Sequence, residues 1–306
     1  MSTYSRRDFL RQSMAITAAV VASPRHVATS TAFLTKGLRH PFFAAARNRP
    51  EVIAHRGGAG EWPAETKFAF TEAVEIGVDV LEMDVHLTRD QHLILMHDET
   101  VDATTNGRGL IRKLTLAQLK RLDAGYRWTN DGGKTFPYRK KGITIPTLKE
   151  IFEAFPAMRM NIEMKSSTLS PVKALSDQIR EHRMIDRVLV ASSSDSFLQE
   201  FRKLSPGVAT SMSAQELAHF LLTQTLPKAD SSLREPDALQ SKERIPFFQL
   251  LNKTVVDRAH GLNLPVHAFT VNRTADMRRM IEAGVDGIIT DYPSRLMGLV
   301  GRKVNG

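Results

Sequence analysis

The chain contains no cysteine among its 306 residues, so it has no disulfide, no thiolate metal ligand and no cysteine nucleophile. Long apolar runs are also missing: no stretch of about 18 uncharged apolar residues occurs, so no membrane-spanning helix is predicted for the mature chain. A fold without disulfides must be stabilised by its core. The hydrophobic content of 42% is typical of a soluble globular protein.

Acidic residues are too few to balance the basic ones, and the net charge is +9. Such an excess favours a nucleic-acid partner only when the folded part of a protein carries it. Residues 1–50 hold eight basic side chains and one acid, whereas the remainder holds 34 basic and 32 acidic side chains. The basicity therefore belongs mainly to the N-terminal segment, and no nucleic-acid partner is predicted.

The N-terminal segment has the pattern of an export signal. The motif S-R-R-x-F-L at residues 5–10 is followed by twelve uncharged residues at 12–23. A charged stretch followed by a short apolar stretch is typical of a secretory signal, and the paired arginine resembles the twin-arginine (Tat) signal. We therefore predict an exported protein, periplasmic or secreted.

The boundaries of this leader follow from its small residues. Ala22 and Ala32 each offer a cleavage site, and retention as an uncleaved anchor is the alternative. We assign residues 1–32 to the signal and residues 33–50 to a linker or docking segment.

After residue 50, short apolar strands alternate with amphipathic helices. Strands are predicted at residues 51–57, 78–88, 92–98, 159–165, 187–192, 208–212, 264–271 and 285–291. Helices are predicted at residues 66–77, 114–122, 171–182, 195–204, 214–226, 247–261 and 274–284. This alternation predicts a parallel sheet closed as a TIM (β/α)8 barrel. An open doubly wound sheet is the alternative, but no glycine-rich dinucleotide fingerprint follows the first strand.

Two predicted connections are longer than ordinary loops. Residues 123–146 contain four aromatic and several basic side chains, a composition that fits either a basic surface loop or a lid over a charged site. Residues 213–246 combine the helical pattern at 214–226 with a polar run.

The strand at residues 78–88 carries two acids in an apolar setting. Because side chains alternate with period two, Glu82 and Asp84 share one face of this strand. The same alternation at residues 159–165 turns Glu163 and Lys165 inward. Charged groups are rarely buried unless they are paired or coordinated, so these acids are predicted to hold a cation.

Several strand ends carry chemically active side chains, and in a TIM barrel functional groups lie at the C-terminal ends of strands. His55 and Arg56 end the first strand, and His97 ends the third. Carboxylates without thiols favour a hard cation such as Mg²⁺ or Ca²⁺, whereas the two histidines also admit zinc. Histidines near neutral pKa suit an acid/base pair, and Arg56 with Lys165 suits a phosphate.

Taken together, these motifs resemble those of the glycerophosphodiester phosphodiesterase family. The resemblance rests on the series AHRG, EMDVHLTRD, LILMHDET, TNGRG, IPTLKEIF, NIEMK, AFTVN and GIITDYP, which runs from about residue 51 to 297. It implies a TIM-barrel catalytic domain at residues 51–301 and a metal-dependent phosphodiesterase. The implied substrate is a small glycerophosphodiester, cleaved to glycerol 3-phosphate and an alcohol.

The resemblance also implies a role for each matching residue. His55 and His97 correspond to the catalytic acid/base pair. Arg56 and Lys165 correspond to phosphate contacts, and Phe269 occupies a position, usually tryptophan, that lines the alcohol pocket. The implied ligands of one divalent cation, Ca²⁺ or Mg²⁺, are Glu82, Asp84 and Glu163.

One motif departs from the family pattern. Where the family usually has P-E-N-T, this chain has Pro63-Ala64-Glu65-Thr66, so the acid is displaced by one position to Glu65. In an extended loop one step reverses the direction of a side chain. Either Glu65 replaces the missing group or the site has lost a secondary metal contact, and Glu65 is therefore a candidate only.

Other polar residues near these motifs are given less weight. His86 shares a face with Glu82 and Asp84, and is interpreted as a rim residue rather than a further ligand. Asp98 is predicted to orient the loop after His97, and a supporting role in positioning His97 is the alternative. Asp291, in the motif TDYP, is interpreted as a turn or barrel-closing residue rather than a catalytic one.

Two alternative functions remain open from the sequence. The first is a phospholipase D-like enzyme acting on lysophospholipids, in which residues 123–146 would contact a lipid surface. The second is a non-catalytic phosphoester-binding protein, which the altered P-A-E-T motif would allow. Both histidines and all three acids are present, which favours an enzyme, because binding alone needs no proton-transfer pair.

Overall fold

The computed structural model describes residues 40–44, 49–165, 170–226 and 234–302. The predicted signal at residues 1–32 lies outside the described residues. No helix within the described ranges is long and apolar enough to cross a bilayer.

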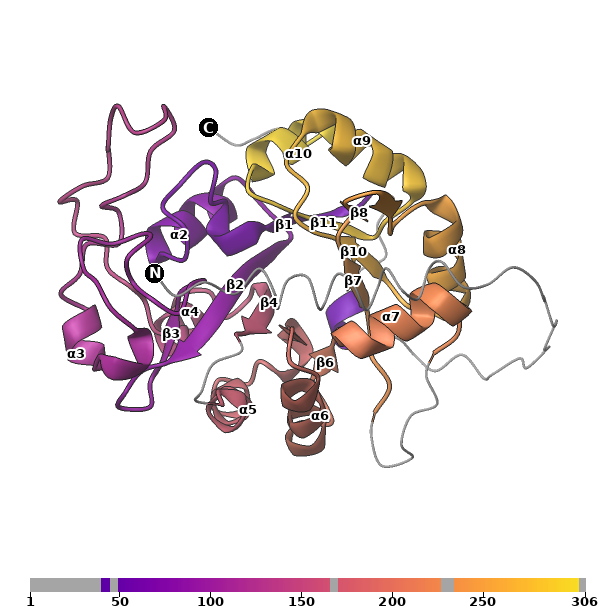
Figure 1. The fold of residues 1–306 in the computed structure, drawn as a ribbon, viewed down its shortest axis with the longest axis horizontal. Coiled ribbons are helices and arrows are strands. Elements are labelled where there is room, and N and C mark those ends of the chain that lie inside the picture. The colour runs from indigo at the N-terminus through magenta and orange to yellow at the C-terminus, as the bar shows by residue number, and fades with distance from the viewer. Residues whose placement is uncertain (1–39, 45–48, 166–169, 227–233, 303–306) are drawn as a thin grey trace.

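Eight parallel strands form a curled sheet in the order β6–β5–β4–β2–β1–β11–β10–β7, with helices around the outside (Figure 1). They are β1 (Glu51–Ala54), β2 (Val80–Leu87), β4 (Arg159–Met164), β5 (Val188–Ser192), β6 (Ala209–Thr210), β7 (Leu239–Ser241), β10 (Val266–Ala268) and β11 (Gly287–Thr290). β6 and β7 stand at the two ends of this order, and one parallel bridge between Ser211 and Ala238 links the residues next to them. The predicted parallel sheet is confirmed as a TIM-barrel-like arrangement.

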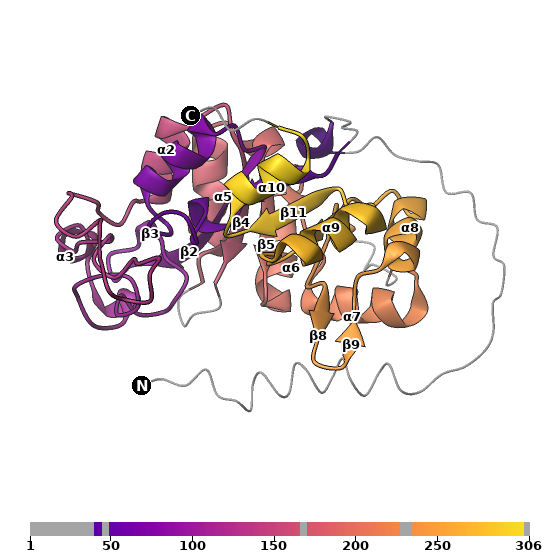
Figure 2. The same cartoon turned by 90° about the horizontal axis from the view of Figure 1, so that it is seen from above.

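The helices cover the outer face of this sheet, as a view from above also shows (Figure 2). They are α2 (Lys67–Glu75), α3 (Leu116–Leu119), α4 (Leu148–Ala154), α5 (Val172–Glu181), α6 (Asp195–Leu204), α7 (Ala214–Thr223), α8 (Lys253–Gly261), α9 (Thr274–Ala283) and α10 (Pro293–Leu299). Single 3-10 turns occur at η1 (Pro41–Phe43), η2 (His55–Gly57), η3 (Ile111–Lys113) and η4 (Ile185–Arg187).

Local sequence signals explain where several helices begin. Thr147 starts α4 and Ser213 starts α7, each with a glutamate three residues later that completes a capping box. Asn252 starts α8, because its side chain accepts a hydrogen bond from the backbone N–H of Val255.

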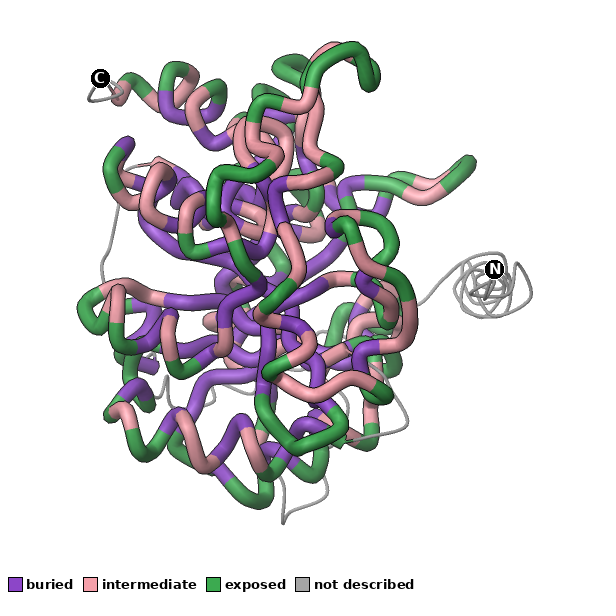
Figure 3. The backbone as a smooth tube through the Cα atoms, turned by 90° about the vertical axis from the view of Figure 1, so that its left-hand side faces the viewer, coloured by how far each residue is buried: buried purple, intermediate pink, exposed green. Residues whose placement is uncertain are grey.

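The core has an outer and an inner part. Buried residues run along the strands in the middle of the molecule, and exposed residues lie on the surrounding helices and loops (Figure 3). The larger cluster joins the sheet to its helices. A smaller cluster inside the sheet includes Ile53, Val80 and Ile289, and Phe42 and Phe43 of η1 pack into it.

Three expectations about individual elements are wrong. The strand predicted at residues 92–98 is β3 (Leu93–Leu95), which runs antiparallel to β2 and is not one of the eight parallel strands. The polar run before residue 246 contains the parallel strand β7, which the sequence analysis missed. The short turn between residues 88 and 92 explains the first error, because parallel strands need a longer crossover.

The third error concerns the helix predicted at residues 247–261. In the structure α8 begins only at Lys253, and the preceding residues form the hairpin β8 (Arg244–Ile245) and β9 (Phe248–Gln249). Two local features favour this arrangement: Pro246 occupies the turn, and the Asn252 cap fixes the helix start.

The long segment between β3 and α4 has an apolar cluster of its own, which includes Val101, Ile111 and Leu119. Within this segment, the indole N–H of Trp128 donates a hydrogen bond to the backbone oxygen of Ala59 at 3.1 Å. Tyr138 contacts the rings of Trp128 and Phe68 with centroid distances of 5.0 and 5.2 Å. These contacts hold residues 123–146 against the loop that follows η2 and against the first turn of α2.

Candidate active site

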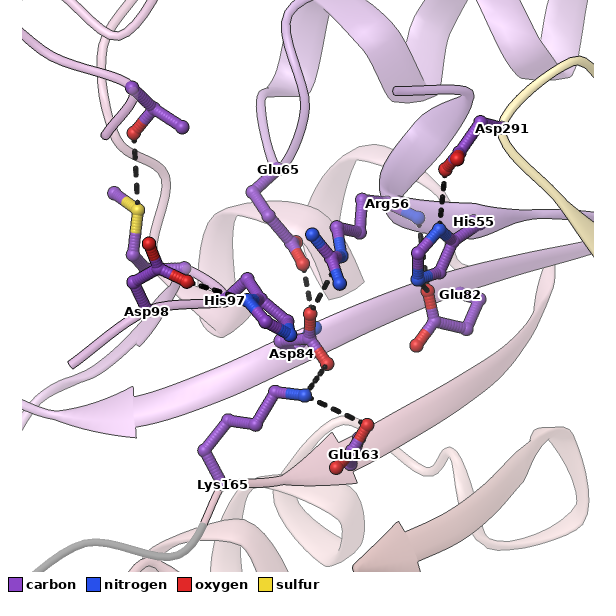
Figure 4. A network of polar contacts seen from close by, with 12 residues as sticks. His55, Arg56, Glu65, Glu82, Asp84, His97, Asp98, Glu163, Lys165 and Asp291 are labelled. Carbon is purple, nitrogen blue, oxygen red and sulfur yellow. Dashed lines mark hydrogen bonds and ion pairs between the residues drawn. The ribbon is translucent and has the colours of Figure 1, made fainter. Parts of the chain in front are cut away.

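The first functional side chain stands at the C-terminal end of β1. The chain turns sharply at η2, where Arg56 adopts φ 53°. His55 Nδ1 lies 2.5 Å from Asp291 Oδ1, so the carboxylate accepts from the Nδ1–H (Figure 4). Asn272 Nδ2 donates to the other oxygen of Asp291 at 2.6 Å. This chain of contacts fixes the ring and leaves Nε2 facing the site.

Asp291 reaches His55 because β11 pairs with β1. Ala54 lies opposite Thr290 in the register, so the residues that follow, His55 and Asp291, meet at the strand ends. The interpretation of Asp291 as only a turn or barrel-closing residue missed this contact. The first and last strands of a closing barrel are neighbours, and that rule was the available signal.

The predicted acidic residues come from β2 and β4. In the parallel register Glu82 lies opposite Asn161, and Asp84 lies opposite Glu163. One carboxylate oxygen from each of Glu82, Asp84 and Glu163 lies within 4.8 Å of the other two. The period-two alternation therefore brings the three acids together as the sequence predicts.

Two basic side chains contact these acids. Arg56 Nε lies 3.1 Å from Asp84 Oδ2, and the Arg56 backbone N–H donates to Glu82 Oε2 at 3.0 Å. Lys165 Nζ lies between two carboxylates, 3.0 Å from Asp84 Oδ1 and 2.9 Å from Glu163 Oε2. Asp84 is thus held from both sides (Figure 4).

His97 enters the site by the antiparallel return of β3. Val85 lies opposite Leu95, and the Met96 N–H donates to the backbone oxygen of Asp84, so His97 comes level with the acids. Its Nδ1 lies 2.7 Å from Asp98 Oδ1, so Asp98 contacts the ring of His97 itself, the alternative to orienting the loop. The side chain of His97 is 42% exposed, whereas that of His55 is 14% exposed.

The two acids of β2 have different pKa values because their surroundings differ. Burial and the nearby Asp84 raise the pKa of Glu82 to about 7. Burial would also raise the pKa of Asp84, but Lys165 and Arg56 outweigh it and lower that pKa to about 2. The two acids on one strand face therefore differ in their readiness to ionise.

The residues present fit a divalent metal ion. Glu82, Asp84 and Glu163 offer only oxygen donors, which hard cations prefer. Burial and the neighbouring Asp84 raise the pKa of Glu82, and a divalent cation beside it would favour the ionised carboxylate. The oxygen set suits Ca²⁺ and Mg²⁺ alike.

Glu65 is also part of this site. It adopts φ 59°, is 3% exposed, and its Oε1 accepts from the Asp84 backbone N–H at 2.9 Å. Its Oε2 is buried and finds no hydrogen-bond partner among the described residues. Burial, with Asp84 and Glu82 nearby, raises the pKa of Glu65 well above its usual value.

Two further predicted residues can be placed. Phe269 follows β10 and packs, partly buried, against the inner cluster that contains Phe42. His86 Nε2 donates to the backbone oxygen of His97 at 3.2 Å, and His86 lies outside the acidic cluster. His86 thus supports the His97 segment.

Comparison with known proteins adds independent findings. Residues 55–295 match the Glycerophosphoryl diester phosphodiesterase family. A curated glycerophosphodiester phosphodiesterase of Caldanaerobacter subterraneus is 36% identical over 258 residues, which cover 81% of this chain and 97% of that protein. A human lysophospholipase D is 25% identical over 295 residues, covering 87% of this chain and 91% of the relative.

Solved structures show the same similarity. A phosphodiesterase of Oleispira antarctica, in complex with the product sn-glycerol-3-phosphate, aligns with a TM-score of 0.65 and 28% identity. That alignment covers 82% of this chain and 96% of the other. A protein of Silicibacter pomeroyi aligns with a TM-score of 0.69 and 28% identity over 83% of this chain and 94% of the other.

Proposed function

The chain belongs to the glycerophosphoryl diester phosphodiesterase family, and we propose that it hydrolyses glycerophosphodiesters to glycerol 3-phosphate and an alcohol with a divalent metal ion. One observation carries the residue assignment: two histidines, each bound to its own carboxylate, flank a cluster of three acids, an arginine and a lysine. A non-catalytic phosphoester-binding protein would need no such pair.

Each part of the site has a proposed task. Arg56 and Lys165 bind the phosphate oxygens and stabilise the charge that gathers in the transition state. Glu82, Asp84 and Glu163 would hold the Ca²⁺ or Mg²⁺ ion, which when bound polarises a phosphoryl oxygen. Phe269 lines the pocket for the alcohol.

The histidines move the protons. Because Asp291 and Asp98 accept from Nδ1–H, the Nε2 atoms of His55 and His97 are free to exchange protons with the substrate. One Nε2 takes the proton of the attacking substrate hydroxyl as its oxygen bonds to phosphorus. The phosphorus–oxygen bond to the alcohol breaks, and the other Nε2 protonates the departing oxygen. Water then opens the resulting cyclic phosphate with the two roles reversed.

The test is release of glycerol 3-phosphate from glycerophosphocholine by the purified full chain. We expect turnover that is lost after treatment with EDTA and restored by Ca²⁺ or Mg²⁺. Equal turnover with and without EDTA would contradict the metal requirement. Absence of turnover across a panel of glycerophosphodiesters, with either ion, would contradict the proposed activity itself.

Glu65 is proposed to support Asp84. Its carboxyl group accepts from the Asp84 backbone N–H, so Glu65→Ala removes an acceptor next to a proposed metal ligand, whereas Glu65→Gln keeps one. We expect the alanine variant to need about tenfold more metal ion for half-maximal activity, and the glutamine variant to stay close to wild type. If the alanine variant keeps full activity and metal dependence, Glu65 has no such role.

We also propose that the protein is exported through the twin-arginine route. The support is the S-R-R-x-F-L motif and the apolar stretch behind it. Replacing Arg6 and Arg7 together by lysine should retain the protein in the cytoplasm, and Arg11→Lys is the matched control. Equal export of both variants would contradict the route.

A further inference from the structure

The hairpin between β8 and β9 ends in an unusually exposed aromatic side chain. Phe247 is 100% exposed, whereas the other exposed large apolar side chains in the described ranges, Ile185, Leu204 and Leu222, are 38–45% exposed. Ile245 and Phe248, a pair in the hairpin register, flank the tip and are themselves only partly buried. The tip is therefore a small apolar projection, and the hairpin stands out from the body in Figure 2.

The backbone conformation at this tip is one that a bulky aromatic residue rarely adopts. The two-residue turn consists of Pro246 and Phe247, and Phe247 adopts φ 69°. That region favours glycine or asparagine, and a bulky side chain there costs on the order of 1 kcal/mol. Because the Phe247 side chain is fully exposed, no burial of the ring offsets this cost, which indicates a role outside folding.

The hairpin lies on the same face as the candidate active site. It follows the C-terminal end of β7, and His55 and Glu163 come from the C-terminal ends of β1 and β4. Glu82, near the start of the longer strand β2, is level with them because the preceding residue, Leu81, pairs with the last residue of β1. The backbone oxygen of Ser241, at the end of β7, accepts from the N–H of Phe269 at 3.0 Å. The root of the hairpin thus adjoins the residue proposed to line the alcohol pocket.

The root is also firmly held. Glu243 accepts two hydrogen bonds from Arg279 of α9, at 2.9 and 2.7 Å. Its backbone oxygen accepts from the N–H groups of Leu250 and Leu251, which close the base of the hairpin. A rigid base with an apolar end keeps the tip pointing outward.

Positive charge accompanies this tip. Lys242 and Arg244 are exposed at the base of the hairpin. Residues 99–146, which follow the antiparallel strand β3 and His97 and precede α4, carry ten basic and four acidic side chains. The rest of residues 51–306 carries 24 basic and 28 acidic side chains. The basic excess of the folded part therefore belongs to a connection on the site's face.

We propose that the Phe247 tip inserts into the headgroup region of an anionic phospholipid bilayer and holds the active site against it. An apolar end above a basic base is the arrangement that binds such surfaces, because the ring enters the interface and the cations meet anionic headgroups. The inference rests on the proposed function and specifies its substrate class: lysophospholipids, which reside in the membrane. The named human relative is a lysophospholipase D.

The experiment measures binding of the full chain to vesicles of phosphatidylglycerol and phosphatidylcholine. We expect Phe247→Ser to weaken binding about tenfold or more, since burial of one phenylalanine is lost. Arg244→Gln should weaken binding about fivefold, and only when the anionic lipid is present. Leu204→Ser, at the end of α6 on the opposite face, is the matched control and should bind like wild type.

A second measurement locates the contact. Phe247→Trp places a fluorophore at the tip, and we expect its emission to shift to the blue and to be quenched by brominated lipids. Equal binding of wild type and Phe247→Ser, or a tryptophan unaffected by brominated lipids, would overturn the proposal and attribute any binding to another part of the chain.

Hydrolysis separates this inference from the proposed function. Phe247→Ser should keep wild-type turnover of soluble glycerophosphocholine and lose turnover of lysophospholipid embedded in the vesicles. If wild type hydrolyses neither substrate, the proposed function is contradicted. The vesicle-binding comparison would still test whether the tip docks on the bilayer. Equal turnover of embedded lysophospholipid by wild type and variant would contradict the docking role.

Discussion

The two histidines of the active site do the same kind of work from different surroundings. His55 lies 14% exposed in a turn held by β1, β11 and Asn272, and its partner Asp291 is 23% exposed. His97 is 42% exposed on the segment after β3, and its partner Asp98 is 48% exposed. The fold thus fixes the orientation of one histidine and leaves the other open to solvent.

This difference indicates how the fold divides the tasks of catalysis. A buried carboxylate–histidine pair is strong and costs much to break, because neither partner has water as a substitute. An exposed pair is weak, since water replaces either partner at little cost. The His55 side should therefore depend on its supporting residues, and the His97 side should depend mainly on the histidine itself.

The largest effects are expected from the histidines themselves. His55→Ala and His97→Ala should each lower kcat by about 10²–10⁴-fold, because each removes a proton-transfer group. His92→Ala, an exposed histidine outside the site, is the control and should turn over normally. Circular dichroism would verify folding. Near-normal activity of either site variant would contradict the assignment of the two histidines as the acid/base pair.

The supporting carboxylates test the comparison directly. Asp291→Asn should lower kcat about 10–100-fold, because the amide no longer holds the Nδ1–H tautomer of His55. Asp98→Asn should lower kcat by no more than about threefold, since water can serve His97. Equal losses in the two variants would show that exposure does not govern the importance of the partner.

The pH profile of the same two variants sharpens this result. Burial lowers the pKa of His55, but Glu82 and then Asp291 raise it, and the balance lies above its usual value. Asp291→Asn removes one of the raising interactions, so the limb of the kcat/KM profile that belongs to His55 should move to lower pH. Asp98→Asn should leave that limb in place.

A smaller effect is expected one step further from the substrate. Asn272 donates to Asp291 Oδ2 and accepts from the Asp291 N–H at 2.9 Å, so Asn272→Ala loosens the carboxylate without removing it. We expect kcat to fall about threefold to tenfold, near the low end of the losses seen when residues that support a catalytic group are removed, with KM little changed. Asn252→Ala, which removes the cap of α8, should cost about 1 kcal/mol of stability and leave kcat unaltered.

The sequence predicted the acids well because their placement is a matter of local period. Alternation along β2 and β4 is enough to bring Glu82, Asp84 and Glu163 to one face, and parallel pairing brings that face together. Asp291 was missed because its contact joins the first and last strands, which no local pattern encodes. His97 was expected at the end of a parallel strand and arrives instead by the antiparallel strand β3.

The hairpin and Glu65 show a second limit. The apolar residues at 247–251 fit a helical period, and the helix prediction failed because the turn at Pro246 and the cap at Asn252 decide the local structure. The direction of Glu65 depends on its positive φ, which is set by the surrounding loop rather than by the residue itself.

A third histidine shows what burial does to a ring that is hydrogen-bonded to an amide instead of a carboxylate. His267 of β10 is 1% exposed, and its Nδ1 accepts a hydrogen bond from Gln240 Nε2 at 3.2 Å instead of donating to a carboxylate. Burial lowers its pKa to about 4, and Asp286, which raises it, does not offset this. His55 and His267 are both shielded from water, yet their pKa values move in opposite directions.

The lowered pKa of His267 predicts that the stability of the folded protein depends on pH. As the pH falls from about 6.5 towards 4, the unfolded chain protonates His267 and the folded protein does not, so stability is lost over that window. His267→Gln removes this proton-linked loss, so the stability of wild type relative to the variant should fall by about 2 kcal/mol between pH 7 and pH 4.5. Denaturant unfolding at the two pH values measures the difference, with His92→Gln as the exposed control. An unchanged difference would show that burial does not lower the pKa of His267 in the folded protein.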